Sequence, residues 1–389
     1  MNKFKLFLSF LIISFLMIIL PSYGQNTGKE SMPLKLEYAV GKIQEISSEK
    51  ENKLLHETLG GIQTTQTVKV KIISGKHKGE TVETQNQLTS NPAYDIKIKP
   101  GSRVILEIEE KGDKSDFYIS DLERAPALMI ILGLFLTLIL TVSGIKGLRT
   151  LFSLGITAFL VFFVLIPAIL SNYPIIPTTI AIALISTLVT MFVIGGINIK
   201  SLSATLGTVG GLSVAGLLSM LIIKIAPLTG LTDQESVILW TSRPDLDFTG
   251  ILTAAMIIGS LGAIMDVGIS IASSITEVKE TNPLLSPTQL IKSGLNVGTD
   301  IIGAMSNTLI LAYIGGAFPL ILLAANVPFI KFINLNSIAS EIAAAIAGSI
   351  GIVLCVPITA AISGYLIGRQ ATLKNQIIKE DLTDNIFNK

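Results

Sequence analysis

The sequence is poor in charge, in cysteine and in histidine. Only 15% of its 389 residues are charged, and 29 Lys and Arg nearly balance 28 Asp and Glu, so no basic surface for nucleic acid is indicated. The single cysteine, Cys355, excludes an intrachain disulfide framework. His56 and His77 lack metal-ligand spacing, and phosphate-binding glycine motifs are missing. We therefore expect no metal, no cofactor and no nucleic-acid partner.

Apolar residues are abundant instead. Half of the chain is hydrophobic and the mean hydropathy is +0.66, a composition typical of membrane proteins. The charged residues crowd between residues 25 and 125. The chain therefore contains a polar part, followed by a part that belongs in a lipid bilayer.

The first 24 residues have the form of a secretory signal. Two lysines precede about fifteen apolar residues, and Ser22 and Gly24 form a small-x-small pair with cleavage expected after Gly24. The alternative is an uncleaved anchor helix, for which the apolar run is slightly short. Either interpretation places residues 25–125 outside the cytoplasm.

Within residues 25–125, the stretch 33–123 shows the two-residue period of β-strands. In "QTVKVKIIS", Val68, Val70 and Ile72 alternate with lysines. "SGKHKGE" and "KPGSR" are typical of turns, and "RVILEIEE" and "DFYIS" are typical of strands. About five strands predict a small barrel or sandwich. Because no acid, base and nucleophile converge in it, we interpret this domain as a docking module for an envelope protein.

Residues 126–367 contain about seven apolar runs, each near the length that crosses a bilayer. The runs are 126–143, 150–170, 178–196, 203–226, 248–275, 294–325 and 337–367. An odd number of spans after an outer domain places the tail, residues 368–389, in the cytoplasm, and the distribution of Lys and Arg agrees. We predict an α-helical membrane bundle in the bacterial cytoplasmic membrane, preceded by a small extracytoplasmic β-rich domain.

The fifth run contains an aspartate. In "GAIMDVGISIASSITEV", Asp266 is followed by Ser270, Ser273, Ser274 and Glu277 on one helix face. An ionisable group at the bilayer centre costs roughly 2.5–3.5 kcal/mol on insertion scales, and such groups usually face a bundle interior or a water-filled cavity. We predict a functional role for Asp266; the alternative is a protonated carboxyl that only packs.

The sixth run repeats the pattern. "GLNVGTDIIGAMSNTLILAYIGGAFP" places Asp300 near the cytoplasmic end, with Asn307 and Thr308 further along one face. The two helices are expected to be antiparallel, with Asp266 and Asp300 at similar depth and their polar stripes lining one cavity. The alternatives are helix packing for Asn307 and helix capping for Asp300.

Small residues mark packing and breaks in the other runs. Gly207, Gly211 and Ala215 recur every four residues, which predicts close helix packing. Gly315, Gly316 and Pro319 interrupt the sixth run, where we expect a kink, with a broken helix as the alternative.

The loop before the fifth run carries two further patterns. Thr232 and Glu235 have capping-box spacing, which predicts a short surface helix. Asp245 and Asp247 are interpreted as solvated loop residues, with a cation-attracting mouth as the alternative.

Several long segments together resemble a known family. The β-rich part, "GLRTLFSLGITAFLVFFVLIPAIL", "GAIMDVGISIASSITEV", "GTDIIGAMSNTLILAYIGG" and "IAGSIGIVLCVPITA" are similar, in this order, to the YibE/F family of multispanning bacterial membrane proteins. The resemblance covers nearly all of the chain after the signal region. It implies a membrane protein and transfers no catalytic or ligand-binding residue.

The favoured function is a transporter or ion-coupled permease for a small ion or solute. Asp266 and Asp300 would carry charge, while Ser270, Ser273, Ser274, Asn307 and Thr308 supply neutral ligands. The alternative is a membrane scaffold or envelope assembly factor that acts through its β domain. An aspartyl protease is disfavoured, because "IMDVG" and "VGTDI" contain neither YD nor GxGD. We expect no enzymatic activity.

Overall fold

The computed structural model describes residues 36–51, 64–89, 91, 93, 95–111, 114–323 and 326–387, with only the backbone at residues 36, 51, 111 and 114 and from residue 370 onwards. The predicted signal segment and His56 lie outside these residues. The chain divides between residues 141 and 142 into two compact units. One unit holds the β domain and the start of the first helix, and the other holds the remaining helices; each is described by itself.

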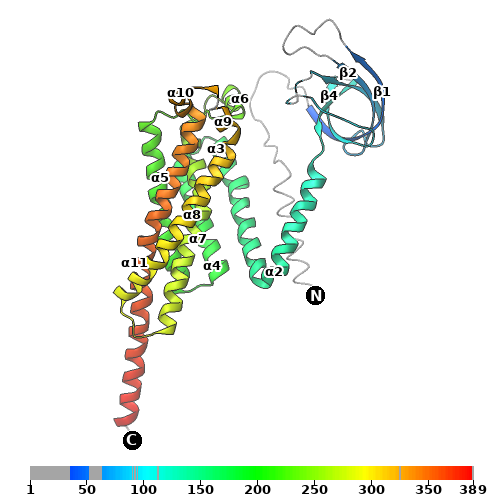
Figure 1. The fold of residues 1–389 in the computed structure, drawn as a ribbon. Helices are drawn as coiled ribbons and strands as arrows, with labels where there is room; N and C mark the ends of the chain where they lie inside the picture. The colour runs from blue at the N-terminus through cyan, green and yellow to red at the C-terminus, as the bar shows by residue number, and fades with distance from the viewer. Residues whose placement is uncertain are drawn as a thin grey trace. The chain divides into compact units, whose positions relative to one another are not determined.

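Five antiparallel strands form the β domain as a single curled sheet (Figure 1). The strands are β1 (Leu36–Glu51), β2 (Thr64–Ile72), β3 (Thr81–Leu88), β4 (Arg103–Lys111) and β5 (Lys114–Leu122), in the order β3-β2-β1-β4-β5. Val68, Val70 and Ile72 are fully buried, whereas Lys69 and Lys71 between them are exposed. The predicted two-residue period is therefore confirmed in β2.

The polar strand β3 was not among the predicted strands. Its interior positions hold Thr84 and Asn86, which are buried. Thr84 Oγ1 donates to the backbone oxygen of Phe117 at 2.5 Å, and Asn86 Nδ2 donates to Gln66 Oε1 at 3.0 Å and to the oxygen of Ile96 at 2.9 Å. Hydrogen bonds thus replace apolar contacts on the inner face of β3, which hides the strand from a hydrophobicity pattern.

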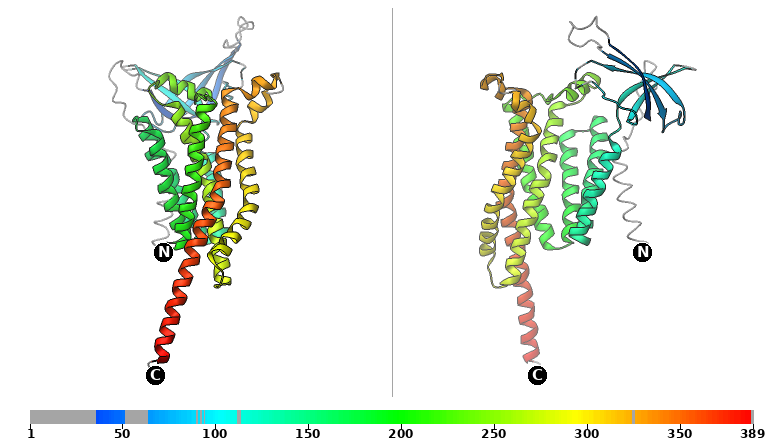
Figure 2. Two further views of the ribbon diagram at one scale, coloured as in Figure 1. Left: turned by 90° about the vertical axis from the view of Figure 1, so that its left-hand side faces the viewer. Right: turned by 45° about the vertical axis from the view of Figure 1, so that its right-hand side comes forward.

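The second unit is helical (Figures 1 and 2). Its elements are α2 (Ala125–Leu160), the π-helical turn η2 (Val161–Leu165), α3 (Ile166–Leu170), α4 (Ile175–Gly195), α5 (Ile199–Ile225), α6 (Gln234–Ser242), α7 (Phe248–Thr281), α8 (Pro287–Gly316), α9 (Phe318–Leu323), α10 (Phe329–Ile333) and α11 (Asn336–Phe387), with α2 beginning in the first unit.

Six helical runs among the described residues are long and apolar enough to cross a membrane: Ala125–Leu170, Ile175–Gly195, Ile199–Ile225, Phe248–Thr281, Pro287–Gly316 and Asn336–Arg369. The first run has 46 residues, and its backbone leaves the helical region at Gly144, with φ 53° and ψ −130°. This break separates segments 125–143 and 145–170, which correspond to the first two predicted spans. The predicted count of about seven thus agrees with the structure.

The core of the bundle lies where α5, α7, α8 and α11 meet. An added Cβ on Gly207 would lie 2.0 Å from Thr359 Oγ1, and one on Gly211 would lie 2.7 Å from Cys355 Cβ. Cys355 Sγ is 3.6 Å from the backbone oxygen of Gly207 and 3.7 Å from that of Ile264. Close packing at the predicted small residues is therefore confirmed.

The second half of α2 is held to α4 by hydroxyl groups. Ser153 Oγ donates to Thr190 Oγ1 at 2.6 Å, and Thr157 Oγ1 lies 2.7 Å from Ser186 Oγ. These side chains satisfy one another inside an apolar layer, which is a common form of helix contact in membranes.

Two local expectations need correction. The sixth run is broken rather than kinked, because α8 ends at Gly316 and α9 begins at Phe318. The predicted surface helix exists as α6, but its cap is Asp233, which exchanges hydrogen bonds with Ser236. Asp233, and not Thr232, is the cap because its carboxylate accepts the Ser236 backbone N–H at 2.7 Å. That N–H holds the pKa of Asp233 below its usual range.

Asp245 and Asp247 have structural partners. The Arg243 side chain donates to Asp245 at 2.9 and 2.8 Å, and Asn172 donates to it at 2.9 Å. The guanidinium, followed by the Asn172 amide, holds the pKa of Asp245 well below its usual range. Asp247 accepts the Gly250 N–H at 3.0 Å and caps α7. These contacts fix the loop between α6 and α7.

Candidate functional site

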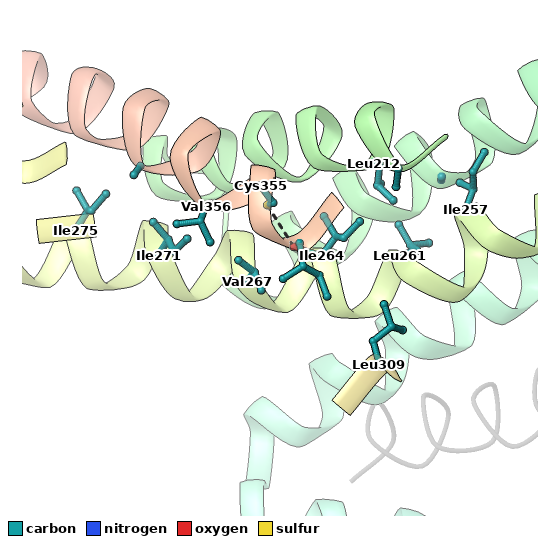
Figure 3. Packing of buried hydrophobic residues seen from close by; sticks show 14 of the residues in the cluster. Leu212, Ile257, Leu261, Ile264, Val267, Ile271, Ile275, Leu309, Cys355 and Val356 are labelled. Carbon is teal, nitrogen blue, oxygen red and sulfur yellow. Dashed lines mark hydrogen bonds between the residues drawn. The ribbon is translucent and has the colours of Figure 1, made fainter. Parts of the chain in front are cut away.

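The candidate site begins on α7, where Asp266 lies close to the middle of the helix. Ile264, Val267, Ile271 and Ile275 are fully buried on one side of α7. Figure 3 shows these four side chains lying along the helix, with Cys355 and Val356 of α11 beside them. Asp266 occupies the other side and is exposed. The apolar residues between the polar positions therefore form the core.

The serines after Asp266 take intermediate positions. Ser270, Ser273 and Ser274 are half-buried, and Ser274 Oγ donates to the backbone oxygen of Ser270 at 2.9 Å. Glu277 is exposed on the same side of α7 as Asp266. The predicted stripe thus exists as a continuous face, and it turns away from the packed core.

The second helix of the site, α8, starts earlier than its hydropathy indicates. Ser286 and Gln289 form a reciprocal capping box with Pro287 at the first turn. Asp300 is consequently near the middle of α8 and not near its end, and the capping alternative for Asp300 is wrong. The run predicted from residue 294 missed this polar first turn, because a hydropathy window does not register a cap.

The two faces of α8 differ sharply. Leu290, Gly294, Gly298 and Leu309 are buried against α7 and α11. Asp300, Asn307 and Thr308 are exposed on the remaining surface. Thr308 Oγ1 donates to the backbone oxygen of Ala304 at 2.8 Å, so its hydroxyl is already satisfied within the helix.

The contacts between α7 and α8 define their relative depth. An added Cβ on Gly294 would lie 2.5 Å from Ile275, and one on Gly298 would lie 3.4 Å from Ile271. The helices are therefore antiparallel, as predicted. Continuing this register places Asp266 level with about residue 303, so the two carboxylates differ in depth by about 5 Å at 1.5 Å per residue.

Neither carboxylate has a partner in the described part of the chain. No hydrogen bond or ion pair involves Asp266 or Asp300 there. Each charge would cost roughly 2.5–3.5 kcal/mol at the bilayer centre. No group of three or more His, Cys, Asp and Glu that could hold a metal ion occurs in the described residues. The site is thus two uncompensated acidic groups on neighbouring helices.

Neither Asp266 nor Asp300 lines the two recesses described next. A polar groove of about 590 Å³ runs between the edge strands β3 and β5 of the β domain. An apolar groove of about 370 Å³ lies between the ends of α8 and α11, with Tyr313 and Glu341 among its lining residues. Sequence reasoning missed both grooves. An acidic residue within an apolar run was the signal available for Glu341.

Comparison with known proteins identifies both parts of the chain. The family described as YibE/F-like protein matches residues 131–369, and the YibE/F family N-terminal domain matches residues 35–122. A search of curated proteins and a search of solved structures give no match. The two family matches coincide with the helical bundle and the β domain. The chain therefore belongs to the YibE/F family, as a protein with a multispanning helical region and an N-terminal β domain.

Proposed function

We propose that this protein is an ion-coupled permease in which Asp266 and Asp300 carry the coupling cation or proton. One observation supports the proposal most: two carboxylates without partners lie at similar depth on adjacent membrane helices. Carboxylates inside membrane helices are costly, and they often mark ion and proton pathways. The serines of α7 and Asn307 of α8 are neutral groups along the same faces.

The proposed orientation puts the β domain outside the cytoplasm and the C-terminal tail inside. Outside the C-terminal tail, the basic side chains assigned to the inside are Lys146 and Arg149 in α2, Lys200 in α5, Lys279 in α7 and Lys292 in α8. Each lies in or near a helix end or break, close enough to count in the positive-inside bias. The membrane in question is the bacterial cytoplasmic membrane.

The test is flux through the purified full-length protein in liposomes. Vesicles loaded with the pH dye pyranine report proton movement driven by a potassium diffusion potential, and tracer sodium reports sodium movement. We expect Asp266→Asn to lower the active flux at least tenfold, since an amide neither titrates near neutral pH nor supplies a negative charge to balance a cation. Glu280→Gln, an exposed carboxylate at the end of the same helix, should transport normally. Equal flux in wild-type and Asp266→Asn vesicles would disprove the role of Asp266.

A second candidate function is a scaffold that binds an envelope protein through the β domain. The groove between β3 and β5 favours it, because both are edge strands and an edge strand can pair with an extended peptide. The same flux assay separates the two functions. A permease should retain flux when residues 30–120 are removed, whereas a scaffold should show no Asp266-dependent flux in either form.

A further inference from the structure

The exposed polar face of α8 has the residue spacing of a helix–helix contact, although none of the described helices packs against it. Asn296, Asp300, Gly303 and Asn307 are all exposed, and they follow one another at intervals of four, three and four residues. Alternating spacings of three and four residues are those of the contact line, or seam, between two helices that pack with a left-handed crossing. The opposite face of α8 already packs against α7 and α11, so the exposed seam is a second one.

A glycine on this seam, Gly303, also indicates a helix contact. An added Cβ on Gly294 or Gly298, on the packed face, would lie 2.5 Å from Ile275 or 2.2 Å from Val356. An added Cβ on Gly303 meets nothing within 4 Å. Small residues in membrane helices let another helix approach closely. The first two glycines are explained within the chain, and Gly303 is not.

The chemistry of the seam selects its occupant. The first segment of α2, residues 125–143, is apolar, and the hydroxyls of Thr137 and Thr141 donate to its own backbone at 2.8 and 3.0 Å. It offers nothing to Asp300 or Asn307. A second α8 offers matching groups, because an amide both donates and accepts. A polar Asn at one seam position also fixes the register of a parallel helix pair.

We propose that a second copy of this chain packs against the polar face of α8, so that Asp300 of each copy faces Asp300 of the other. All copies share one membrane orientation, and a two-fold axis along the membrane normal brings equal residues together. Gly303 allows close approach, and the two Asn307 amides bond to each other. Two facing carboxylates cannot both stay charged in a low dielectric, so the pair forms a site for one shared proton. The site is incomplete in one copy.

As an account of the coupling site, this inference rests on the proposed function, but the contact itself is measured without flux. The experiment uses the full-length protein in native membranes, with Cys355 replaced by Ser. Single cysteines are placed at each position from 295 to 311 and oxidised with copper phenanthroline. A disulfide requires Cα atoms within about 7 Å. The yield of the covalent dimer should peak at positions 296, 300, 303 and 307.

The matched control is Leu217→Cys on α5, where Leu217 is 67% exposed. We expect Gly303→Cys to form dimer at least ten times as efficiently as Leu217→Cys. Uniform or absent cross-linking over 295–311 would overturn the proposal. A peak that traps a product of a mass other than two chains would also overturn it, because the partner would then be a different protein.

A further variant separates this inference from the proposed function. Asp300→Asn keeps a hydrogen-bonding group at the contact but removes the proton site, so Gly303→Cys should still cross-link in that background, although proton flux is lost. Asn307→Leu should reduce the cross-linking several-fold while thermal unfolding shows an intact fold. Cross-linking with unchanged flux in Asp266→Asn would refute the permease and leave the contact standing. Loss of flux in Asp266→Asn without any cross-linked dimer would support the permease and refute the contact between two copies.

Discussion

At the scale of single residues, Gly211 shows how tightly α5, α7 and α11 are packed. An added Cβ there would lie 2.7 Å from Cys355 Cβ, 2.9 Å from Ile264 Cγ2 and 3.0 Å from the backbone oxygen of Gly351. Three helices converge on this point, so no single neighbour can yield without disturbing another. The spacing of small residues predicted the closeness of these helices, although it did not identify their partners.

We expect Gly211→Ala to destabilise the helical unit by about 1–3 kcal/mol through overpacking. This corresponds to a Tm lower by roughly 2–12 °C for a unit of this size, measured by thermal unfolding in detergent. Gly155→Ala in α2 is the matched control, because an added Cβ there meets nothing within 4 Å. An equal loss in both variants would show that the contact at Gly211 does not carry the effect.

The polar residues of α7 and α8 show what a sequence pattern can and cannot decide. Periodicity correctly grouped Asp266 with the serines and Asp300 with Asn307, because a helix fixes which residues share a face. The direction of each face depends on the packing partners. Ile264, Val267 and Ile271 provide a better fit to α5 and α11 than the polar side does, so both polar faces point outward.

At the scale of the elements, hydropathy located nearly every helix but misplaced several ends. The reason is that caps and breaks involve few residues and polar chemistry, as at Gly144 and at the Ser286 capping box. Strand β2 was predictable because its valines alternate, whereas β3 was not because Thr84 and Asn86 replace apolar residues inside. Hydrogen bonding and backbone conformation determine the helix ends and the strand that the hydrophobicity pattern does not predict.

The turn between α7 and α8 holds a buried lysine that can be tested. Lys279 is 7% exposed, and its Nζ donates to the backbone oxygens of Pro283 and Leu285, both at 2.8 Å. We expect Lys279→Met to cost about 1–3 kcal/mol, because two carbonyl groups lose a charged donor. Thermal unfolding and limited proteolysis at residues 281–286 measure this. Lys292→Met, at an exposed position on α8, should change neither the unfolding temperature nor the cleavage. Equal cleavage at residues 281–286 in the two variants would contradict the role of the Lys279 hydrogen bonds.

At the scale of the whole molecule, the two units have separate hydrophobic cores. The β domain is built around residues such as Ile43, Val70 and Leu106. The helical core, which includes Ile264 and Cys355, contains no residue of the β domain. Their distinct composition was visible in the sequence, since charge is concentrated in one part and apolar runs fill the other. A domain with its own core is expected to fold independently.

We therefore expect a fragment of residues 33–123 to be soluble and to unfold cooperatively in urea. A domain of this size should have a free energy of unfolding of about 5–13 kcal/mol, measured by far-UV circular dichroism. Val70 has no exposed surface, so Val70→Ala should lower that value by about 1–3 kcal/mol by leaving a cavity. Lys71→Ala, on the exposed side of the same strand, should leave it within about 0.5 kcal/mol. A fragment that melts gradually, or responds equally to both substitutions, would mean that the β domain depends on the helical unit for its core.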